Sequence, residues 1–365
     1  MELVPGVDEV DGDRDTGSSR LVSRQRHGAY TVLTAAPWGA AIAPVPPFPK
    51  PRFDYTYDLA RERAALRAYR REKPGRQIPA KAKDSLLVGT WNVANLGVQD
   101  RLDSDYELIA EVIGWFDLVA VQEVNDDLRG IQAIHDHLPS RYDLLFSDAS
   151  GNRERQAFLY DSRRVKRLRE VGRVAIPPSQ LPRIAREGTA TPFTGFDRGP
   201  YLASFEAGAF RFALLNVHLF FGSDEPADLD RRTLETFAVA WWADRTHRDR
   251  HSYVGDVVPL GDFNLPKAVP GDRIFDALVA LGLETPSHSS HIGSAIASDN
   301  QYDQIAFFPG TTKDRFTGTC NVFDFDGALF QDLWSDPKRT PSQFRGYVRY
   351  HISDHRPLWA EFHTA

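Results

Sequence analysis

The sequence has almost no cysteine, since Cys320 is the only one among 365 residues. A lone cysteine cannot form an internal disulfide, and without a cysteine cluster any metal ion must be held by oxygen and histidine ligands. The lack of disulfides is typical of a reducing compartment, and we expect a cytoplasmic protein.

Long apolar runs are also lacking. Residues 1–28 carry scattered charges and no apolar stretch of the kind found in signal peptides, and four prolines interrupt residues 29–48. We therefore expect neither a signal peptide nor a membrane span, and no membrane partner. With 42% hydrophobic and 26% charged residues, the composition is that of a globular protein with one large domain or two ordinary ones.

The net charge of −6 conceals two regions of opposite sign. Residues 1–84 hold 15 Lys and Arg against 11 Asp and Glu, whereas residues 85–365 hold 29 against 39. An acidic body does not attract a phosphate backbone through its net charge, although a bound divalent cation could offset this locally.

The basic region divides into two parts. Residues 1–53 are rich in Gly, Ser and Pro and predict a flexible or extended segment. Residues 54–84 form a basic segment in which apolar spacing predicts a helix over 54–72, ending before Pro74. We expect this helix to dock on the acidic body, and contact with nucleic acid is the alternative.

From residue 85 onward, short apolar runs alternate with turn residues and amphipathic stretches. The runs predict strands at 86–91, 118–121, 157–160, 201–205, 212–217, 257–260, 305–308 and 357–362. Apolar spacing predicts helices at about 103–115, 126–137, 229–246 and 272–281. This order fits one α/β domain over residues 85–365, with two sheets packed face to face and helices outside.

Polar side chains repeatedly lie at the ends of these predicted strands, where α/β folds place their ligand-binding crevice. Each one alone is typical of a turn or a cap, but their recurrence at six strands indicates a shared site. The set comprises Asn92, Glu123, His218, Asp262 with Asn264, Asp303, and Asp354 with His355.

Carboxylates, carboxamides and imidazoles without any thiol suit Mg²⁺ or Mn²⁺, whose coordination is completed by water and substrate phosphate. Phosphoester hydrolysis needs a polarising cation, a group that activates or orients water, and donors for the developing charge. Because crowded carboxylates alone would repel a phosphate, the metal ion and the imidazoles are both required in this interpretation.

Six motifs follow one another in a fixed order between residues 86 and 363. They are Trp91-Asn92, Gln122-Glu123, Asn216-Val217-His218-Leu219, Gly261-Asp262-Phe263-Asn264, Tyr302-Asp303 and Ser353-Asp354-His355. Together they resemble the motifs of the endonuclease/exonuclease/phosphatase superfamily. The resemblance implies the deoxyribonuclease I-like fold, a four-layer α/β sandwich of two mostly antiparallel sheets flanked by helices.

The resemblance also implies a ligand set and a group that acts on water. The cation would be surrounded by Asn92, Glu123 and Asp354, and Asp262 would activate or orient the attacking water. Asn264 would hold the phosphate.

Two imidazoles complete the implied machinery. His355, paired with Asp303, would stabilise the phosphoryl oxygen, and His218 would be the general acid or a phosphate donor. The segment around Glu154 resembles the one that supplies a glutamate to that histidine in deoxyribonuclease I, and the segment around Arg198 resembles the one that supplies a phosphate-binding arginine. For these last two residues, ordinary loop ion pairs are the alternative.

Departures from the family pattern bear on the substrate. Ala94 stands where abasic-site enzymes carry an Asp, and Asn125 and Asn152 stand where deoxyribonuclease I inserts Arg and Tyr into the minor groove, which argues against cutting duplex DNA in that way. We expect a Mg²⁺- or Mn²⁺-dependent endonuclease acting on nucleic acid, DNA rather than RNA, with no obligate protein partner. The alternatives are a phosphomonoesterase or sphingomyelinase-type hydrolase of a small phosphoester, and a non-catalytic nucleic-acid-binding or scaffold protein.

Overall fold

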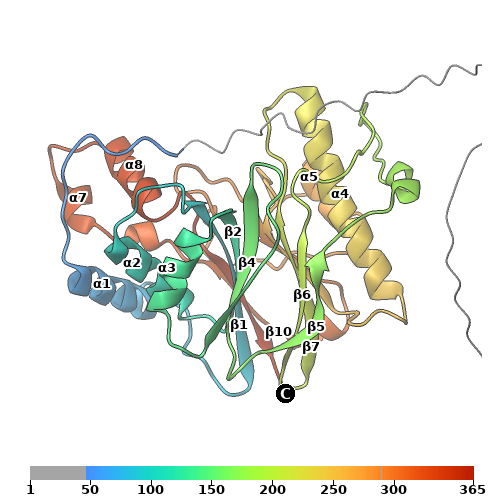
Figure 1. Ribbon diagram of the computed structural model, residues 1–365, viewed down its shortest axis with the longest axis horizontal. Helices are drawn as coiled ribbons and strands as arrows, with labels where there is room; N and C mark the ends of the chain where they lie inside the picture. The colour runs from blue at the N-terminus through green and yellow to red at the C-terminus, as the bar shows by residue number, and fades with distance from the viewer. Residues whose placement is uncertain (1–46, 289) are drawn as a thin grey trace, which may run out of the picture. The chain divides into compact units, whose positions relative to one another are not determined.

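Two β-sheets pack face to face in the computed structural model, which describes residues 47–288 and 290–365 (Figure 1). Most of the predicted 1–53 segment, residues 1–46, lies outside the described residues. The six-stranded sheet has the order β10-β11-β1-β2-β4-β3, and the five-stranded sheet has the order β5-β6-β7-β8-β9.

The six-stranded sheet is antiparallel except where β1 runs parallel to β2. Its central strand β1 is buried along its whole length, as the apolar sequence from Leu86 to Trp91 predicts. Its strands are β1 (Ser85–Leu96), β2 (Leu118–Asn125), β3 (Tyr142–Phe146), β4 (Glu154–Asp161), β10 (Phe316–Val322) and β11 (Leu358–His363).

The five-stranded sheet is also antiparallel apart from one parallel pair, β7 with β8. Its strands are β5 (Lys166–Arg173), β6 (Tyr201–Ala207), β7 (Phe210–His218), β8 (Val257–Asp262) and β9 (Asp303–Ile305). Two mixed sheets of this kind confirm the predicted α/β sandwich. The strand expected at 305–308 is shifted, since only its first residue belongs to β9.

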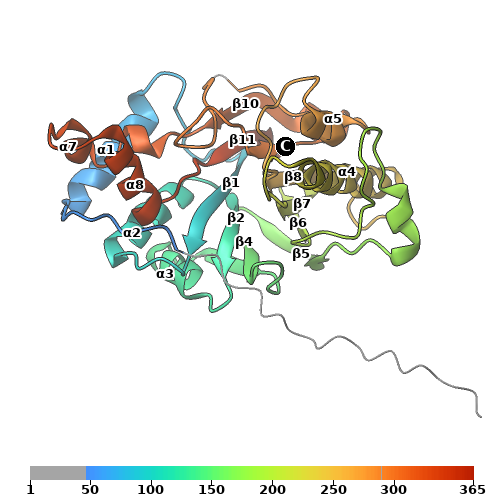
Figure 2. The same ribbon diagram turned by 90° about the horizontal axis from the view of Figure 1, so that it is seen from above.

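Helices cover the outer face of each sheet (Figures 1 and 2). Beside the six-stranded sheet lie α1 (Leu59–Glu72), α2 (Asp103–Ile113), α3 (Arg129–His137), α7 (Gln331–Ser335) and α8 (Pro341–His351). Beside the other sheet lie α4 (Pro226–Arg248) and α5 (Arg273–Val279). The short helix α6 (Thr311–Arg315) and two 3₁₀ turns, Pro178–Arg183 and Phe325–Gly327, complete the described elements. In the described part of the chain, no helix combines the length and apolarity needed to cross a bilayer.

The basic segment is docked through both its aromatic and its charged side chains. Tyr57 packs 5.0 Å from the ring of Phe330, and its hydroxyl donates to Asp105 at 2.7 Å. Along α1, Arg67 forms an ion pair with Glu111 at 2.7 Å. Arg61, Arg63 and Arg76 likewise pair with carboxylates of the body, so these cations are already neutralised within the protein.

One backbone contact fixes the register at the site. Gly261 has φ of +132°, and a Cβ there would lie 2.1 Å from the carbonyl oxygen of Val217. Only glycine permits this approach of β8 to β7. The resulting register sets Asp262 directly opposite His218.

Candidate active site

The predicted site residues come from the strand ends of both sheets. Asn92 lies on β1, Glu123 on β2 and Glu154 on β4, while His218, Asp262 and Asp303 lie on β7, β8 and β9. Asp354 and His355 precede β11. The structure thus brings together residues up to 263 positions apart in the sequence, from Asn92 to His355.

A buried amide pair ties the two sheets together beneath this crevice. Gln122 Nε2 donates to Asn216 Oδ1 at 2.7 Å, and Asn216 Nδ2 donates to the carbonyl oxygens of Val121 and Ala157. These buried hydrogen bonds join the two sheets directly, while Gln122 Oε1 is buried without a partner. The relative position of the two sheets at the site is therefore fixed from below.

Asp262 lies at the centre of the site. Its Oδ1 accepts from the backbone N–H of Asn264 at 2.8 Å, and its Oδ2 accepts from Asn92 Nδ2 at 3.0 Å. The same Oδ2 lies 3.8 Å from Nε2 of His218 and 3.8 Å from Nε2 of His355. Burial raises the pKa of Asp262, but the charges of the two imidazoles outweigh burial and lower it, so the carboxylate stays ionised.

His218 is backed by Glu154, as the resemblance implies. Nδ1 of His218 lies 2.8 Å from Oε2 of Glu154. Burial raises the pKa of Glu154, yet the charges of His218 and Arg198 lower it to about 2. Burial and Arg198 lower the pKa of His218, and Glu154 outweighs them so that it is raised.

Arg198 lies under this pair with its guanidinium engaged on several sides. Its Nε donates to the carbonyl oxygen of His218 at 2.9 Å and its Nη2 to that of Leu219 at 2.7 Å, while Nη1 lies 3.2 Å from Asp197. A contact with substrate phosphate would require some of these bonds to be exchanged. The phosphate-binding role of Arg198 stays a prediction, and the observed geometry supports the positioning of His218.

His355 is backed by Asp303 in a matching way. Its Nδ1 donates to Oδ2 of Asp303 at 2.7 Å, and its carbonyl oxygen accepts from Trp91 Nε1 at 2.7 Å. Burial lowers the pKa of His355, but Asp303 and Asp262 raise it well above the usual value. Burial raises the pKa of Asp303, and the charge of His355 offsets this only in part.

Asn92, Glu123 and Asp354 form the corner to which the resemblance assigns the cation. Asn92 Nδ2 donates to Glu123 Oε1 at 2.9 Å, and Glu123 Oε2 accepts from the backbone N–H of Asn95 at 2.7 Å. Burial raises the pKa of Glu123; the charge of His218 offsets this in part, and the nearby charges of Glu154 and Asp354 raise the pKa further. Asn92 Oδ1 is buried without a hydrogen-bond partner.

These observations fit a hard cation. An unpartnered buried oxygen and a buried carboxylate under like-charge repulsion would both gain from positive charge. Within residues 47–288 and 290–365, no three His, Cys, Asp or Glu side chains are arranged as a ready-made metal site. The oxygens of Asn92, Glu123 and Asp354 are donors of the kind that suit an ion such as Mg²⁺, which binds through one or two carboxylates and keeps water and phosphate as its other ligands.

Asn264 closes the floor of the crevice, with a positive φ of 53°. Its Nδ2 donates to the carbonyl oxygen of Leu219 at 2.8 Å, which holds the side chain beside Asp262. Asparagine tolerates this left-handed conformation better than most residues.

Two residues that position the site have no assigned role in the sequence prediction. Ser353 Oγ donates to the carbonyl oxygen of Asn92 at 2.7 Å and accepts from the N–H of His355 at 3.0 Å. Arg101 is buried and donates to the carbonyl oxygens of Ala94, His351 and Ile352. Ser353 was visible within the Ser-Asp-His motif, whereas nothing in the local sequence marks Arg101.

Two hollows lie next to the metal corner. The smaller one is lined by Asn95, Glu123, Asn152 and Glu154. It shares Val98, Asn125 and Arg153 with a groove of about 480 Å³ that also contains Asp126, Asp127 and Arg129. The site therefore continues into a groove bearing two arginines.

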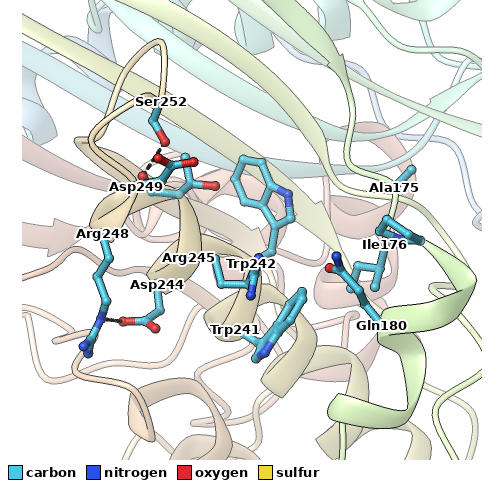
Figure 3. Close-up of a pocket in the computed structure, with 12 residues that line it drawn as sticks. Ala175, Ile176, Gln180, Trp241, Trp242, Asp244, Arg245, Arg248, Asp249 and Ser252 are labelled. Atoms are coloured by element: carbon cyan, nitrogen blue, oxygen red, sulfur yellow. Dashed lines mark hydrogen bonds and ion pairs between the residues drawn. The ribbon is translucent and has the colours of Figure 1, made fainter.

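A cavity of about 570 Å³ lies elsewhere, between the C-terminal half of α4 and the segment around Gln180 (Figure 3). Trp241, Trp242 and Arg245 line it, and Arg245 lies 4.9 Å above the ring of Trp241. None of the predicted site residues lines this cavity.

Comparisons with known proteins identify a relative by sequence and similar solved structures. No family model matches the chain. A deoxyribonuclease of Thioalkalivibrio sp. (strain K90mix) is 30% identical over 303 residues, which cover 78% of this chain and 73% of that protein.

Solved structures are similar to this chain at lower identity. TDP2 of D. rerio, complexed with a single strand DNA product, is 17% identical with a TM-score of 0.50 and covers 76% of this chain and 98% of its own. An endonuclease/exonuclease/phosphatase family protein from Bacteroides thetaiotaomicron is 18% identical with a TM-score of 0.48, over 77% and 95% of the two chains.

The two-sheet sandwich is thus that of a class of phosphoester hydrolases. The chain belongs to the endonuclease/exonuclease/phosphatase superfamily, which confirms the resemblance seen in the six motifs.

Proposed function

We propose that the protein is a divalent-metal-dependent phosphodiesterase and that it cleaves nucleic acid as an endonuclease, with DNA preferred to RNA. The observation that carries the proposal is the position of Asp262 between the two imidazoles, each of which is backed by its own carboxylate. A structural ion pair needs one partner, whereas this arrangement supplies an ionised acceptor and two donors facing the same space.

In this proposal, Mg²⁺ or Mn²⁺ is held by Asn92 Oδ1, Glu123 and Asp354. The ion would polarise the phosphate and supply positive charge where the carboxylates would otherwise repel it. The unpartnered oxygen of Asn92 supports this assignment.

The residues of the chain divide the chemistry between them. Asp262, ionised and close to both imidazoles, orients the attacking water and receives its proton. His355, whose pKa is raised well above its usual value, donates to the phosphoryl oxygen, and His218, whose pKa is also raised, donates to the leaving oxygen. Asn264 contributes a further polar contact with the phosphate.

A polymeric substrate is favoured by the groove that extends from the metal corner past Asn125, Arg129 and Arg153. Its two arginines pair with aspartates of the same groove, Arg129 with Asp127 at 2.6 Å and Arg153 with Asp126 at 3.4 Å, so a backbone phosphate beyond the scissile one would have to replace these carboxylates as their partner. A small phosphomonoester would fill the centre and leave this groove unused. A non-catalytic scaffold would have no use for the paired imidazoles.

We extend the proposal to a cytoplasmic location. Cys320 is buried, and burial raises the pKa of its thiol to about 12, so the single cysteine is neither reactive nor available for a disulfide.

The test uses the 365-residue protein and its Asp262→Asn variant on supercoiled plasmid, single-stranded DNA, RNA and bis-p-nitrophenyl phosphate, each with Mg²⁺, Mn²⁺ or EDTA. We expect polynucleotide cleavage that needs the cation, disappears with EDTA and is lost in the variant. Turnover of the small ester alone would assign the site to a small phosphoester. Inactivity on all four substrates would contradict the proposed function.

A further inference from the structure

An aromatic edge borders the catalytic centre on the side of His355. The imidazole of His355 lies 5.7 Å from the ring of Tyr302, at an angle of 35°. Tyr302 in turn meets the ring of Phe221 at 6.2 Å in an edge-to-face arrangement of 82°. Phe221 follows His218 by three residues and is 43% exposed. Two aromatic rings therefore extend from the reacting groups toward solvent.

Phe221 is held firmly even though it is exposed. Arg232 is only 2% exposed, and its guanidinium carbon lies 4.6 Å from the centre of the Phe221 ring. The same guanidinium donates to the carbonyl oxygens of Phe221 at 2.6 Å and Ser223 at 3.0 Å. A buried cation thus supports the ring and the backbone that presents it.

The turn after Phe221 is equally constrained. Gly222 has φ of +63°, and a Cβ there would lie 2.6 Å from the carboxylate of Asp228. That carboxylate accepts from both the N–H and the hydroxyl of Ser223 at 2.7 Å. These contacts stabilise the loop conformation in which Phe221 is exposed.

A partly exposed phenylalanine forgoes part of the hydrophobic stabilisation that full burial would give. Here this loss coincides with a buried arginine and a glycine of positive φ that keep the ring in place beside a catalytic histidine. A ring presented rigidly to solvent in this way loses little conformational entropy when it binds a flat partner.

We propose that the ring of Phe221, held edge-to-face by Tyr302, is a stacking platform for an unpaired base of single-stranded nucleic acid next to the cleaved phosphate. The proposal rests on the proposed function and specifies its substrate. Stacking of a base on an aromatic side chain is worth about 1–3 kcal/mol and depends little on sequence. Bases in a duplex are stacked on their neighbours, so the platform favours single strands over duplexes.

The binding test uses the 365-residue Asp262→Asn protein with Mg²⁺ and a single-stranded oligonucleotide containing 2-aminopurine, whose fluorescence is quenched by stacking. Phe221→Leu, added to this protein, keeps apolar volume but removes the aromatic face. We expect it to abolish the quenching and to weaken single-strand binding about 5- to 150-fold, which corresponds to one lost stack. Duplex binding should change less than twofold.

The matched control is Tyr253→Leu. Tyr253 is 45% exposed and packs under Arg211 at the start of β7, at the opposite end of that strand from His218. The Tyr253→Leu substitution should leave both the quenching and the single-strand affinity unchanged. An equal loss in the two variants, or unchanged quenching in Phe221→Leu, would overturn the platform.

Cleavage assays separate this proposal from the proposed function. If the otherwise unchanged protein cuts polynucleotides and Phe221→Leu alters single-strand and duplex cleavage by the same factor, only the platform is wrong. If Phe221→Leu slows the hydrolysis of bis-p-nitrophenyl phosphate as much as that of single-stranded DNA, the rings bind an aromatic leaving group. The proposal that they bind a base would then be wrong. If the unchanged protein cuts no polynucleotide, the proposed function itself fails.

Discussion

The two imidazole–carboxylate pairs face the same oxygen of Asp262 at the same distance of 3.8 Å, yet their surroundings differ. The pair of His218 and Glu154 lies beside Arg198, whose charge favours ionised Glu154 and disfavours protonated His218. The pair of His355 and Asp303 lies beside the ring of Tyr302. In this pair, burial is the main factor that disfavours the charged form of Asp303.

This difference assigns different tasks to two chemically identical side chains. Arg198 weakens the hold of His218 on its proton, whereas Asp303 and Asp262 hold the proton of His355 more firmly. We therefore expect His218 to release its proton to the leaving oxygen, and His355 to remain a charged donor throughout.

The largest expected effect comes from replacing Asp262, whose carboxylate both imidazole–carboxylate pairs face. Asp262→Asn keeps the shape and the bond from the Asn264 N–H but removes the acceptor between the imidazoles, so cleavage should fall by about 10³-fold or more. Initial rates on single-stranded DNA measure the loss. Asp314→Asn, an exposed carboxylate on α6, is the control and should be silent. An active Asp262→Asn protein would contradict its central role.

The next comparison separates the two histidines. His218→Ala and His355→Ala should each slow DNA cleavage by about 10²- to 10⁴-fold while leaving the melting temperature within a few degrees. With a leaving group that needs no proton, such as p-nitrophenolate, His218→Ala should lose less than 10-fold and His355→Ala should stay severely impaired. Equal losses on both substrates would show that the two imidazoles act alike.

Replacing the partner carboxylates should have smaller effects on activity. Glu154→Gln and Asp303→Asn should each lower activity by about 10- to 100-fold, as is typical of carboxylates that orient a functional histidine. Their effects on stability should differ. Glu154→Gln leaves the charge of Arg198 with less compensation and should lower the melting temperature. Asp303→Asn removes a charge that burial already disfavours and should lower the melting temperature less. Thermal unfolding of both variants at neutral pH distinguishes them, and equal destabilisation would contradict the contrast.

The smallest expected effect concerns Tyr302. Tyr302→Phe keeps the ring beside His355 and loses only the hydroxyl that accepts from Asn300 Nδ2. Cleavage of single-stranded DNA should change less than threefold, because the ring rather than the hydroxyl faces the site. A loss as large as that of Asp303→Asn would give the hydroxyl a role that the geometry does not.

Most of the fold could be predicted because its central strands are buried on both faces and read as apolar runs. β1, β2, β7 and β8 are of this kind. β5 was missed because its sequence, Lys166 to Arg173, is largely charged and only Leu168 is buried along it. β3 and β10 are likewise partly exposed edge strands with no continuous apolar run.

The candidate site could be predicted as a set of strand-end residues, but not as a geometry. Spacing along the chain does not reveal that Glu154 reaches His218 or that Asp303 reaches His355, and the resemblance alone implied those pairs. Arg101 could not be found at all, since its role depends on carbonyl oxygens about 250 residues away. The prediction that residues 85–365 form a separate domain stays a prediction.

The close approach at Gly261 affects how the sequences of relatives of this chain should be interpreted. A side chain there would collide with the backbone of Val217 whether or not the protein is a catalyst. In a saturation-mutagenesis library selected only for solubility, we expect position 261 to reject every substitution and position 262 to accept several. A relative that has lost its chemistry would therefore keep the glycine of the Gly-Asp-Phe-Asn motif and lose the aspartate, so the glycine identifies the fold and the aspartate identifies the enzyme.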